Sequence, residues 1–467
     1  MPLTLELAKR INALRFEHLP AQAVHWAKVG ILDTVGVTLA GSTDPAVRSV
    51  VRVLAPADGP SLIFGSRQRV STLDAALING TAAHALDFDD CNNTLGGHPS
   101  VPILPALFAL ADEHGASGRE FITAYVAGFE TECKIALAVN FHHYMHGWHP
   151  TATLGVFGAA AACARLLHLD NAQTATALAI AASFAAGIKA NFGTMVKPLH
   201  VGQCARHGLF AALLARDGFS ANPLAFEHKQ GYFEVFDGAG NYDAARILPA
   251  WANPLDIVQP GIAIKQYPCC GSTHPALDAM IGLARSHDLD PEHVEHVDAW
   301  IHARRLEHTN RPDPRSTTDA KFSVQYCVAR ALVDRKVVIE HFEGEAFREP
   351  RVKNVMTRVR AAPCTTEQFP ADNHFGAEIK VTLRDGTVLS AKVDQPLGRT
   401  SANPLPPQRL KEKFDNCAAR VVKRQEDVAL IHATIEDLDN LRDVRTLTHQ
   451  IVIERRSRHE ALLEKPV

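Results

Sequence analysis

Four polar clusters interrupt the apolar helical pattern of this 467-residue chain, and their residue types are suited to acid–base chemistry. The first has three aspartates between two histidines, the second four histidines, the third basic groups among small residues, and the fourth a lysine, a tyrosine, two cysteines and a histidine. They occupy residues 84–99 (HALDFDDCNNTLGGHP), 142–149 (HHYMHGWH), 193–208 (GTMVKPLHVGQCARHG) and 265–274 (KQYPCCGSTH). Imidazole, ammonium and carboxylate groups together can bind an acidic substrate and move its protons.

The first cluster crowds three aspartates together, Asp87 among them, and the glycines at 96–97 let the backbone turn tightly before His98. This arrangement could place carboxylates and an imidazole at the mouth of a site. A helix cap followed by a loop, built from aspartate and asparagine, accounts for the same residues. Both interpretations stay open on the residues alone.

The second cluster has metal-like spacing, because His142 and His146 lie four residues apart and could share one face of a helix. The local spacing designates no third ligand and no carboxylate partner, so we expect no metal and place His142, His143 and His146 in a solvated loop. A metal-dependent hydrolase is an alternative that rests on this cluster alone. His149 precedes Pro150 at the expected start of the next helix, where it could face an anionic ligand.

The third and fourth clusters offer cations and thiols. Lys197-Pro198 breaks the helical pattern, so we expect a turn that presents the ammonium group to a carboxylate, although a surface loop explains that spacing equally well. Cys269 and Cys270 are adjacent and cannot chelate one metal in normal geometry. We expect both to be small buried hydrophobic residues.

The composition excludes several classes of protein. Lys plus Arg is 48 and Asp plus Glu is 51, a net charge of −3 that lacks the basic excess of nucleic-acid-binding proteins. The nine cysteines form no CxxC pair, which argues against structural zinc and predicts reduced thiols in a cytoplasmic protein. Residues 1–14 are too charged for a secretory signal, and the Ala-rich residues 171–188 are too polar for a membrane span. With no GxGxxG, P-loop or GxSxG motif, a cofactor-free proton transfer next to a carboxylate is expected.

Hydrophobic spacing predicts the elements that position these clusters. Helical patterns dominate up to about residue 265, and Asp170 is the expected N-cap of one of these helices. Partial alternation at 294–304 predicts a strand, and strict alternation around Asp385-Gly386 at 378–393 predicts a hairpin. The expected helices span residues 21–40, 104–114, 119–140, 152–167, 172–186, 275–287, 320–333 and much of 408–467.

These elements predict a mainly α protein with two domains. A large all-helical domain is expected from both ends of the chain, residues 1–266 and 401–467, with a smaller inserted α+β lid domain at residues 267–400. A cleft between two such domains is a favoured place for a small-molecule site. Lys265, Tyr267 and His274 lie at the expected junction.

Six stretches of the chain resemble the MmgE/PrpD family, which includes 2-methylcitrate dehydratase, cis-aconitate decarboxylase and iminodisuccinate epimerase. The stretches are NGTAAHALDFDD at 79–90, GHPSVPILPALFALAD at 97–112, GWHPTATLG at 147–155, KPLHVG at 197–202, KQYPCCGSTHPALDA at 265–279 and AKFSVQYCVARAL at 320–332. The resemblance covers nearly the whole chain. It implies a helical domain with an α+β lid, assembled as a homodimer.

The resemblance also implies roles for single residues. His149 and His98 are the expected acid and base, Lys197 and His274 bind carboxylates, and Asp87 orients a histidine or takes part in proton transfer. The substrate-binding residues expected beside these catalytic ones are Cys91, His200, Lys265 and Tyr267.

The expected activity is that of a cofactor-independent lyase that removes a proton α to a carboxylate of a small di- or tricarboxylic acid, with dehydration as the outcome. Cys91 stands where the family often has Thr, and residues 94–97 (TLGG) lack the longer insert associated with 2-methylcitrate dehydratases. Epimerisation and decarboxylation on the same scaffold are alternatives, as is a non-catalytic carboxylate-binding protein. No metal, cofactor, nucleic-acid or membrane partner is expected.

Overall fold

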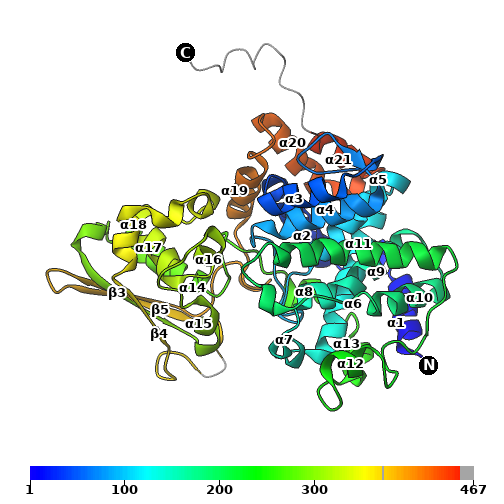
Figure 1. Cartoon of the computed structure of the whole chain (residues 1–467), viewed down its shortest axis with the longest axis horizontal. Helices are drawn as coiled ribbons and strands as arrows, with labels where there is room; N and C mark the ends of the chain where they lie inside the picture. Colours follow the sequence, from blue (N-terminus) through cyan, green and yellow to red (C-terminus); the bar gives the residue numbers. More distant parts are fainter. Residues whose placement is uncertain (371–372, 453–467) are drawn as a thin grey trace, which may run out of the picture. The chain divides into compact units, whose positions relative to one another are not determined.

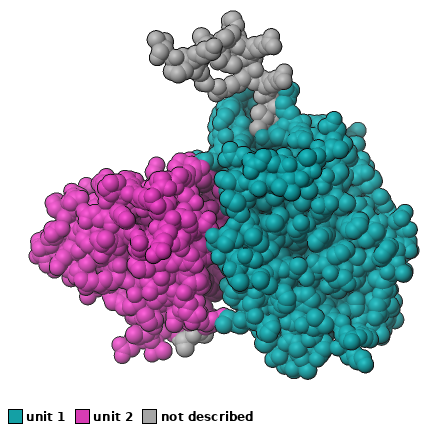
Figure 2. Space-filling model, viewed as in Figure 1, with its two compact units in different colours: residues 1–85, 89–262, 410–467 teal, residues 86–88, 263–409 magenta. Residues whose placement is uncertain are grey.

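The computed structural model describes residues 1–370 and 373–452, and the chain divides into two compact units. Unit 1 contains residues 1–85, 89–262 and 410–467, and unit 2 contains residues 86–88 and 263–409 (Figure 2). Three residues of the HALDFDD motif thus belong to unit 2, although the chain on both sides of them belongs to unit 1. The last part of the helical stretch expected at 408–467, residues 453–467, lies outside the described residues.

Unit 1 is built almost entirely from helices (Figure 1), and the prediction of a mainly α protein is confirmed. Its described helices are α1 (Leu3–Ala13), α2 (Ala21–Gly41), α3 (Pro45–Leu54), α4 (Thr72–Ala85), α5 (Ser100–His114), α6 (Gly118–Val139), α7 (His142–His146), α8 (Pro150–Thr153), α9 (Gly155–Leu166), α10 (Asn171–Ala182), α11 (Val196–Arg216), α12 (Tyr232–Asp237), α13 (Ile247–Ala250), α19 (Pro407–Ala418), α20 (Gln425–Glu436) and α21 (Arg445–Ile451). None of the helices within the described part of the chain has the length and apolarity to cross a membrane.

Local sequence signals explain where several of these helices begin and end. The predicted N-cap Asp170 is confirmed, because its side chain accepts a hydrogen bond from the Gln173 backbone while Gln173 returns one from the Asp170 backbone. Ser117 and Glu120 form the same reciprocal pair at the start of α6. One element was not predicted. A two-stranded sheet of β1 (Asp58–Leu62) and β2 (Arg69–Val70) interrupts the helices, because its strands are too short to show a pattern.

Helices α4 and α11 approach so closely that their backbones touch. A Cβ atom at Gly80 would lie 2.9 Å from the Cα atom of Gly202, and one at Gly202 would lie 2.3 Å from the carbonyl oxygen of Leu77. No side chain larger than hydrogen fits at either glycine without moving a helix. The contact matters because α4 carries His84 and α11 carries Lys197.

Unit 2 contains a four-stranded sheet in the order β4-β3-β5-β6, with β3 and β4 parallel and the other pairs antiparallel. The predicted strand is β3 (Val294–Ile301), and the predicted hairpin is β5 (Ala377–Leu383) with β6 (Val388–Val393). Alternate residues of β3 and β5 are buried, and the helices α14 and α17 pack against the sheet. The remaining elements of unit 2 are α14 (His274–Ser286), α15 (Ala303–Thr309), α16 (Thr317–Lys321), α17 (Val324–Asp334), α18 (Pro350–Met356) and β4 (Val359–Pro363).

Candidate active site

The predicted site residues fall into two groups, one in each unit. Unit 1 holds Cys91, His98, His149, Lys197 and His200, and unit 2 holds Asp87, Lys265, Tyr267 and His274. Each group is built from several elements of its own unit.

In unit 1, two imidazoles share one buried carboxylate oxygen. His84 Nδ1 lies 2.8 Å and His98 Nδ1 2.9 Å from Asp89 Oδ2. His84 comes from the last turn of α4, and His98 follows the tight turn at 96–97, where Gly96 has φ +66°. The Asp89 side chain is fully buried, and its other oxygen Oδ1 has no hydrogen-bond partner among the described residues. The same is true of His84 Nε2.

The shared carboxylate shifts the pKa values of the two histidines in opposite directions. Burial lowers the pKa of His84 to about 4, although Asp89 opposes the shift. Burial would also lower the pKa of His98, but the charge of Asp89, the neighbouring Cys91 and their hydrogen bonds raise it to about 10. The two pKa values differ because the positive charges of Lys197 and His98 disfavour protonation of His84, whereas Cys91 favours protonation of His98 in addition to Asp89. His98 is therefore a cation at neutral pH and His84 is neutral.

Asp89 itself stays ionised in this arrangement. Burial would raise its pKa, but the charges of His84 and His98 and their hydrogen bonds hold it well below the usual range. The next residue behaves differently: burial and the charge of Asp33 raise the pKa of Asp90 well above its usual value, and Asp90 is bound to Ser100 at the start of α5. Asp90 therefore accepts hydrogen bonds from Ser100, the first residue of α5, while Asp89 is the shared partner of His84 and His98.

A second pair of imidazoles contacts the first. His149 Nδ1 lies 3.2 Å from His200 Nδ1, and the His149 ring lies 5.8 Å from the His84 ring between centroids. Burial, followed by the charges of His84 and Lys197, lowers the pKa of His149 well below its usual value, and burial also lowers that of His200. His149 is the N-cap residue of α8, as its place before Pro150 predicted. Both imidazoles are neutral at neutral pH.

Lys197 is buried within the first turn of α11, three residues before His200. The prediction of a turn at Lys197-Pro198 was wrong, because a proline in the first turn of a helix removes no intrahelical hydrogen bond and is tolerated there. The ammonium group lies 5.3 Å from the centre of the Phe192 ring. Lys197 and His200 therefore share one face of α11, on the same side as His149.

Imidazole and carboxylate groups of this kind are also common ligands of divalent metal ions. His84, Asp89 and His98 belong to a group whose ligand atoms lie within 4.8 Å of one another. Both Nδ1 atoms, however, face the same oxygen of Asp89 at hydrogen-bond distance. Protons between nitrogen and oxygen satisfy this geometry without an ion.

In unit 2, Asp87 and Lys265 form a buried ion pair. Lys265 Nζ lies 3.0 Å from Asp87 Oδ1 and donates a second hydrogen bond of 2.6 Å to the Asp87 carbonyl oxygen. Lys321 donates to the neighbouring carbonyl of Leu86 at 2.8 Å. Asp87 has φ +52°, a left-handed conformation that is rare for a residue with a side chain. Two lysines thus hold the strained segment 86–88.

Tyr267 and His274 are packed against each other, with their ring centroids 5.2 Å apart. The Tyr267 hydroxyl donates to Asp278 Oδ1 at 2.6 Å, and burial together with that carboxylate raises the pKa of Tyr267. His274 is the first residue of α14, and its Nε2 lies 3.3 Å from the Cys269 carbonyl oxygen. Both side chains have internal partners that fix their orientation.

Cys269 and Cys270 are buried, as their expected role as small hydrophobic residues requires. Burial would raise the pKa of Cys270, but a hydrogen bond from His308 and its charge lower it to about 7. The same imidazole lies 3.0 Å from the Ser272 hydroxyl through Nε2. Cys270 is thus a polarised thiol, and its partner His308 on α15 could not be identified from the spacing of residues in the sequence.

The solvated loop predicted for His142, His143 and His146 was wrong for the backbone, which forms a helix, and for His143, although His146 is exposed. His143 is fully buried in the short helix α7, with Nδ1 3.1 Å from Asp237 Oδ1 and Nε2 2.8 Å from Thr153 Oγ1. His142 and His146 stack with their ring centroids 5.5 Å apart. Asp237, from α12, could not be identified as a partner because it lies 94 residues away in sequence.

Sequence reasoning missed two residues that organise the first group, His84 and Asp89. Both lie within the HALDFDD motif at residues 84–90, but the motif alone does not show which carboxylate meets which histidine. The spacing of five between them, with one in the last turn of a helix and the other just beyond it, was the available signal.

Comparisons with known proteins match most of the chain to one protein family. Two family models match, the MmgE/PrpD N-terminal domain over residues 5–245 and the MmgE/PrpD C-terminal domain over residues 267–439. Cis-aconitate decarboxylase of Homo sapiens is 29% identical over 460 residues, covering 96% of this chain and 94% of that protein. Cis-aconitate decarboxylase of Aspergillus terreus is 27% identical over 476 residues, covering 95% of each. The mitochondrial 2-methylcitrate dehydratase of Yarrowia lipolytica is 22% identical over 420 residues, covering 84% of this chain and 79% of that protein.

Proposed function

This chain belongs to the MmgE/PrpD family, and on that premise we propose that it is a cofactor-independent lyase that moves protons on a small di- or tricarboxylic acid. The observation that carries the proposal is the buried cation His98, fixed by Asp89 and accompanied by the neutral imidazole of His149. An imidazolium is a proton donor and a neutral imidazole is a proton acceptor. Lys197 adds a buried positive charge suited to a substrate carboxylate.

Decarboxylation of an unsaturated tricarboxylate is the outcome that we place first. In this reaction the bond between a carbon and its carboxylate breaks, and the freed electron pair forms a new carbon–carbon double bond. The electron pair of the old double bond takes a proton from His98, and carbon dioxide leaves. The names of relatives that align with 95% or more of this chain support this outcome.

Dehydration is the second candidate, and the neutral imidazole of His149 favours it. An elimination needs a base to remove the proton α to a carboxylate and an acid to protonate the departing hydroxyl group. His149 Nδ1 faces His200, which leaves Nε2 to act as the base, while His98 serves as the acid. The alignment with a 2-methylcitrate dehydratase also supports this candidate.

In unit 2 we propose supporting roles for the predicted residues. Asp87 orients Lys265 through their ion pair, and Lys265 binds a carboxylate. Tyr267 and His274 hold each other in place through ring contact and act on binding rather than on proton transfer.

The test is turnover in deuterated water, followed by proton NMR and by measurement of released carbon dioxide. The substrates are cis-aconitate, 2-methylcitrate, citrate and iminodisuccinate. Decarboxylation gives carbon dioxide and a product with one deuterium at the carbon that His98 protonates. Dehydration gives a new alkene without carbon dioxide, whereas exchange with inversion and no alkene indicates epimerisation. Failure to convert any of the four acids would contradict the proposal.

Variants test whether the substrate binds to the residues of unit 1. Lys197→Met should raise KM about 10- to 100-fold, because a buried cation that meets a carboxylate is lost. Lys189→Met is the matched control, since Lys189 lies nearby in sequence but donates to the backbone of Tyr144. Equal effects of the two changes would remove Lys197 from the site.

A further inference from the structure

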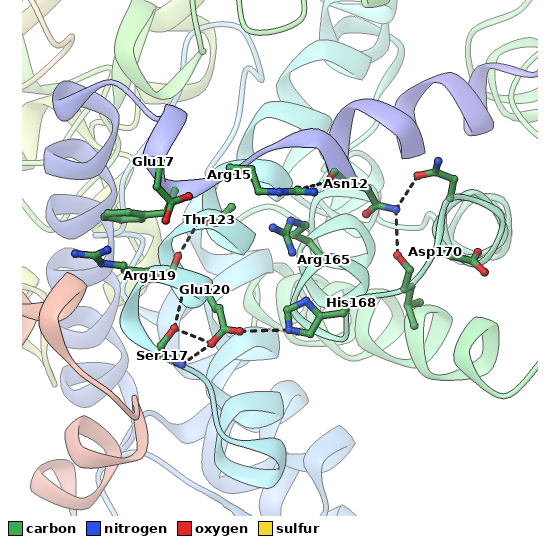
Figure 3. A pocket seen from close by; sticks show the side chains of 13 residues that line it. Asn12, Arg15, Glu17, Ser117, Arg119, Glu120, Thr123, Arg165, His168 and Asp170 are labelled. Carbon is green, nitrogen blue, oxygen red and sulfur yellow. Dashed lines mark hydrogen bonds and ion pairs between the residues drawn. The ribbon is translucent and has the colours of Figure 1, made fainter.

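Unit 1 contains a cavity of about 730 Å³ that none of the candidate active-site residues lines. Its walls come from the end of α1 and the residues after it, the first turns of α6, the end of α9 and the start of α10 (Figure 3). A volume in this range accommodates a small organic molecule. Its charged residues set it apart from an ordinary surface hollow.

Three arginines line the cavity, and among the described residues no carboxylate lies within ion-pair distance of any of them. The hydrogen bonds of Arg15 and Arg165 go to backbone, both reaching the carbonyl oxygen of Leu14 at 3.0 Å. Arg119 donates to the Asp439 carbonyl oxygen at 3.3 Å and lies over the Phe16 ring at 5.0 Å.

Arg165 has spare hydrogen-bonding capacity in addition. Its Nε atom is buried and has no hydrogen-bond partner among the described residues. Burial, followed by the positive charge of Arg15, lowers the pKa of Arg165. Figure 3 shows the two guanidinium groups close together in the middle of the cavity wall. An anion placed between them would relieve their repulsion.

Three acidic residues line the cavity, and two of them, Glu120 and Asp170, are engaged by other groups, while the third is Glu17. Glu120 accepts hydrogen bonds from the Ser117 backbone at 2.9 Å and lies 3.3 Å from His168 Nε2. Asp170 accepts from the Gln173 backbone at 2.8 Å as the cap of α10. Because Glu120 and Asp170 are held by helix caps and a histidine, neither forms an ion pair with the arginines, although the negative charge of Glu120 partly offsets the positive charge around Arg165.

We infer that this cavity is a second ligand site, which binds a small polyanion through Arg15, Arg119 and Arg165. The planar guanidinium group matches the paired oxygens of phosphate and carboxylate groups, so either chemistry fits. The cavity exceeds the size of a single inorganic phosphate. The ligand class is therefore a small organic molecule with two or more such groups, or a condensed phosphate.

The experiment measures binding to the full chain by calorimetry at fixed ionic strength, with pyrophosphate and citrate as probes and acetate as the monovalent control. Pyrophosphate or citrate should bind saturably, and the double change Arg15→Gln with Arg165→Gln should weaken binding at least about tenfold. Arg285→Gln is the matched control, because Arg285 also donates only to a backbone carbonyl, that of Arg335. It should leave binding unchanged.

The two probes separate the possible sources of the anion and separate this site from the active site. Binding of pyrophosphate alone identifies a phosphoryl ligand, and citrate binding that survives Lys197→Met identifies a carboxylate ligand in the cavity. If the double variant does not fold, the single change Arg119→Gln in the same cavity should also weaken binding of the probes. The inference is overturned if neither probe binds saturably, or if the arginine variants bind as tightly as the parent chain.

Discussion

Two histidine–aspartate groups of unit 1 look alike in composition but differ in how completely their hydrogen bonds are satisfied. His143 has a partner on each ring nitrogen, Asp237 on one and Thr153 on the other. In the other group, His84 and His98 compete for a single oxygen of Asp89, which leaves His84 Nε2 and Asp89 Oδ1 without partners among the described residues. Both groups are buried.

The difference teaches how to separate a structural histidine from a working one. A buried polar atom without a partner costs about 1–3 kcal/mol, so a protein keeps one only for a reason. The His143 group has none among its ring nitrogens and can be explained by stability alone. The Asp89 group retains two, together with a strongly perturbed pKa, as expected of a site that meets a ligand.

The largest expected effect comes from removing the shared charge. Asp89→Asn should lower kcat about 10²- to 10⁴-fold at neutral pH, because His98 loses the anion that keeps it protonated. Asp237→Asn, the same change in the other group, should leave kcat of the folded protein unchanged. Steady-state kinetics of both variants, with circular dichroism to confirm folding, make the comparison. Equal losses of kcat would erase the distinction between the groups.

The reverse comparison uses stability. His143→Ala should lower the free energy of unfolding by about 2–4 kcal/mol, because it leaves a cavity and removes the partner of Asp237. His146→Ala is the control on the same short helix, where the side chain is exposed, and should change stability by less than about 0.5 kcal/mol. Urea unfolding measures both. A stable His143→Ala variant with impaired kcat would assign that histidine to catalysis instead.

The pH dependence should distinguish the two histidines of the Asp89 group. The pKa of His98 is raised to about 10, so its contribution to stability is full below the unfolded value of about 6.5 and is lost as pH rises toward 10. The pKa of His84 is lowered to about 4, so stability falls as pH drops from about 6.5 toward 4.

The value of kcat should also depend on the protonation of His98. It should be constant through neutral pH and fall near pH 10, when His98 loses its proton. In Asp89→Asn the fall should move toward neutral pH. Thermal unfolding and kcat measured between pH 5 and about pH 10 record both effects. An alkaline limit that stays in place in the variant would show that His98 is not the acid.

The smallest expected effect concerns the position where the family often has threonine. Cys91 Sγ lies 3.7 Å from His98 Nδ1, a weak contact compared with that of Asp89. Cys91→Thr should therefore change kcat by less than about threefold, with Cys91→Ala as the control for lost volume. A large change in KM for one acid over another would make residue 91 a specificity residue.

Much of the fold followed from local signals in the sequence. Gly41 ends α2, Asp170 caps α10, and the alternation around Asp385-Gly386 gives the hairpin of β5 and β6. These features depend on a few neighbouring residues, which the sequence displays directly.

The site was less predictable, because its contacts join distant segments. The pairing of His143 with Asp237 spans 94 residues, and that of His308 with Ser272 spans 36. The Lys197-Pro198 pair predicts a turn because proline disrupts a helix interior, whereas α11 begins at Val196 and the proline lies in its first turn. Residue types were therefore easier to anticipate than partners, since partners depend on how helices pack.

The contact between Gly80 and Gly202 sets the distance between α4 and α11, and with it the positions of the active-site side chains that these helices carry. Gly80 lies one helical turn before His84, and Gly202 lies just beyond His200 on the helix that begins with Val196. A single added methyl group at either glycine would clash with the backbone of the other helix and force the two helices apart. A change at one of these glycines could therefore adapt the site to a longer or bulkier acid. It would alter the distance between α4 and α11 and keep every acidic, basic and cationic side chain of the site.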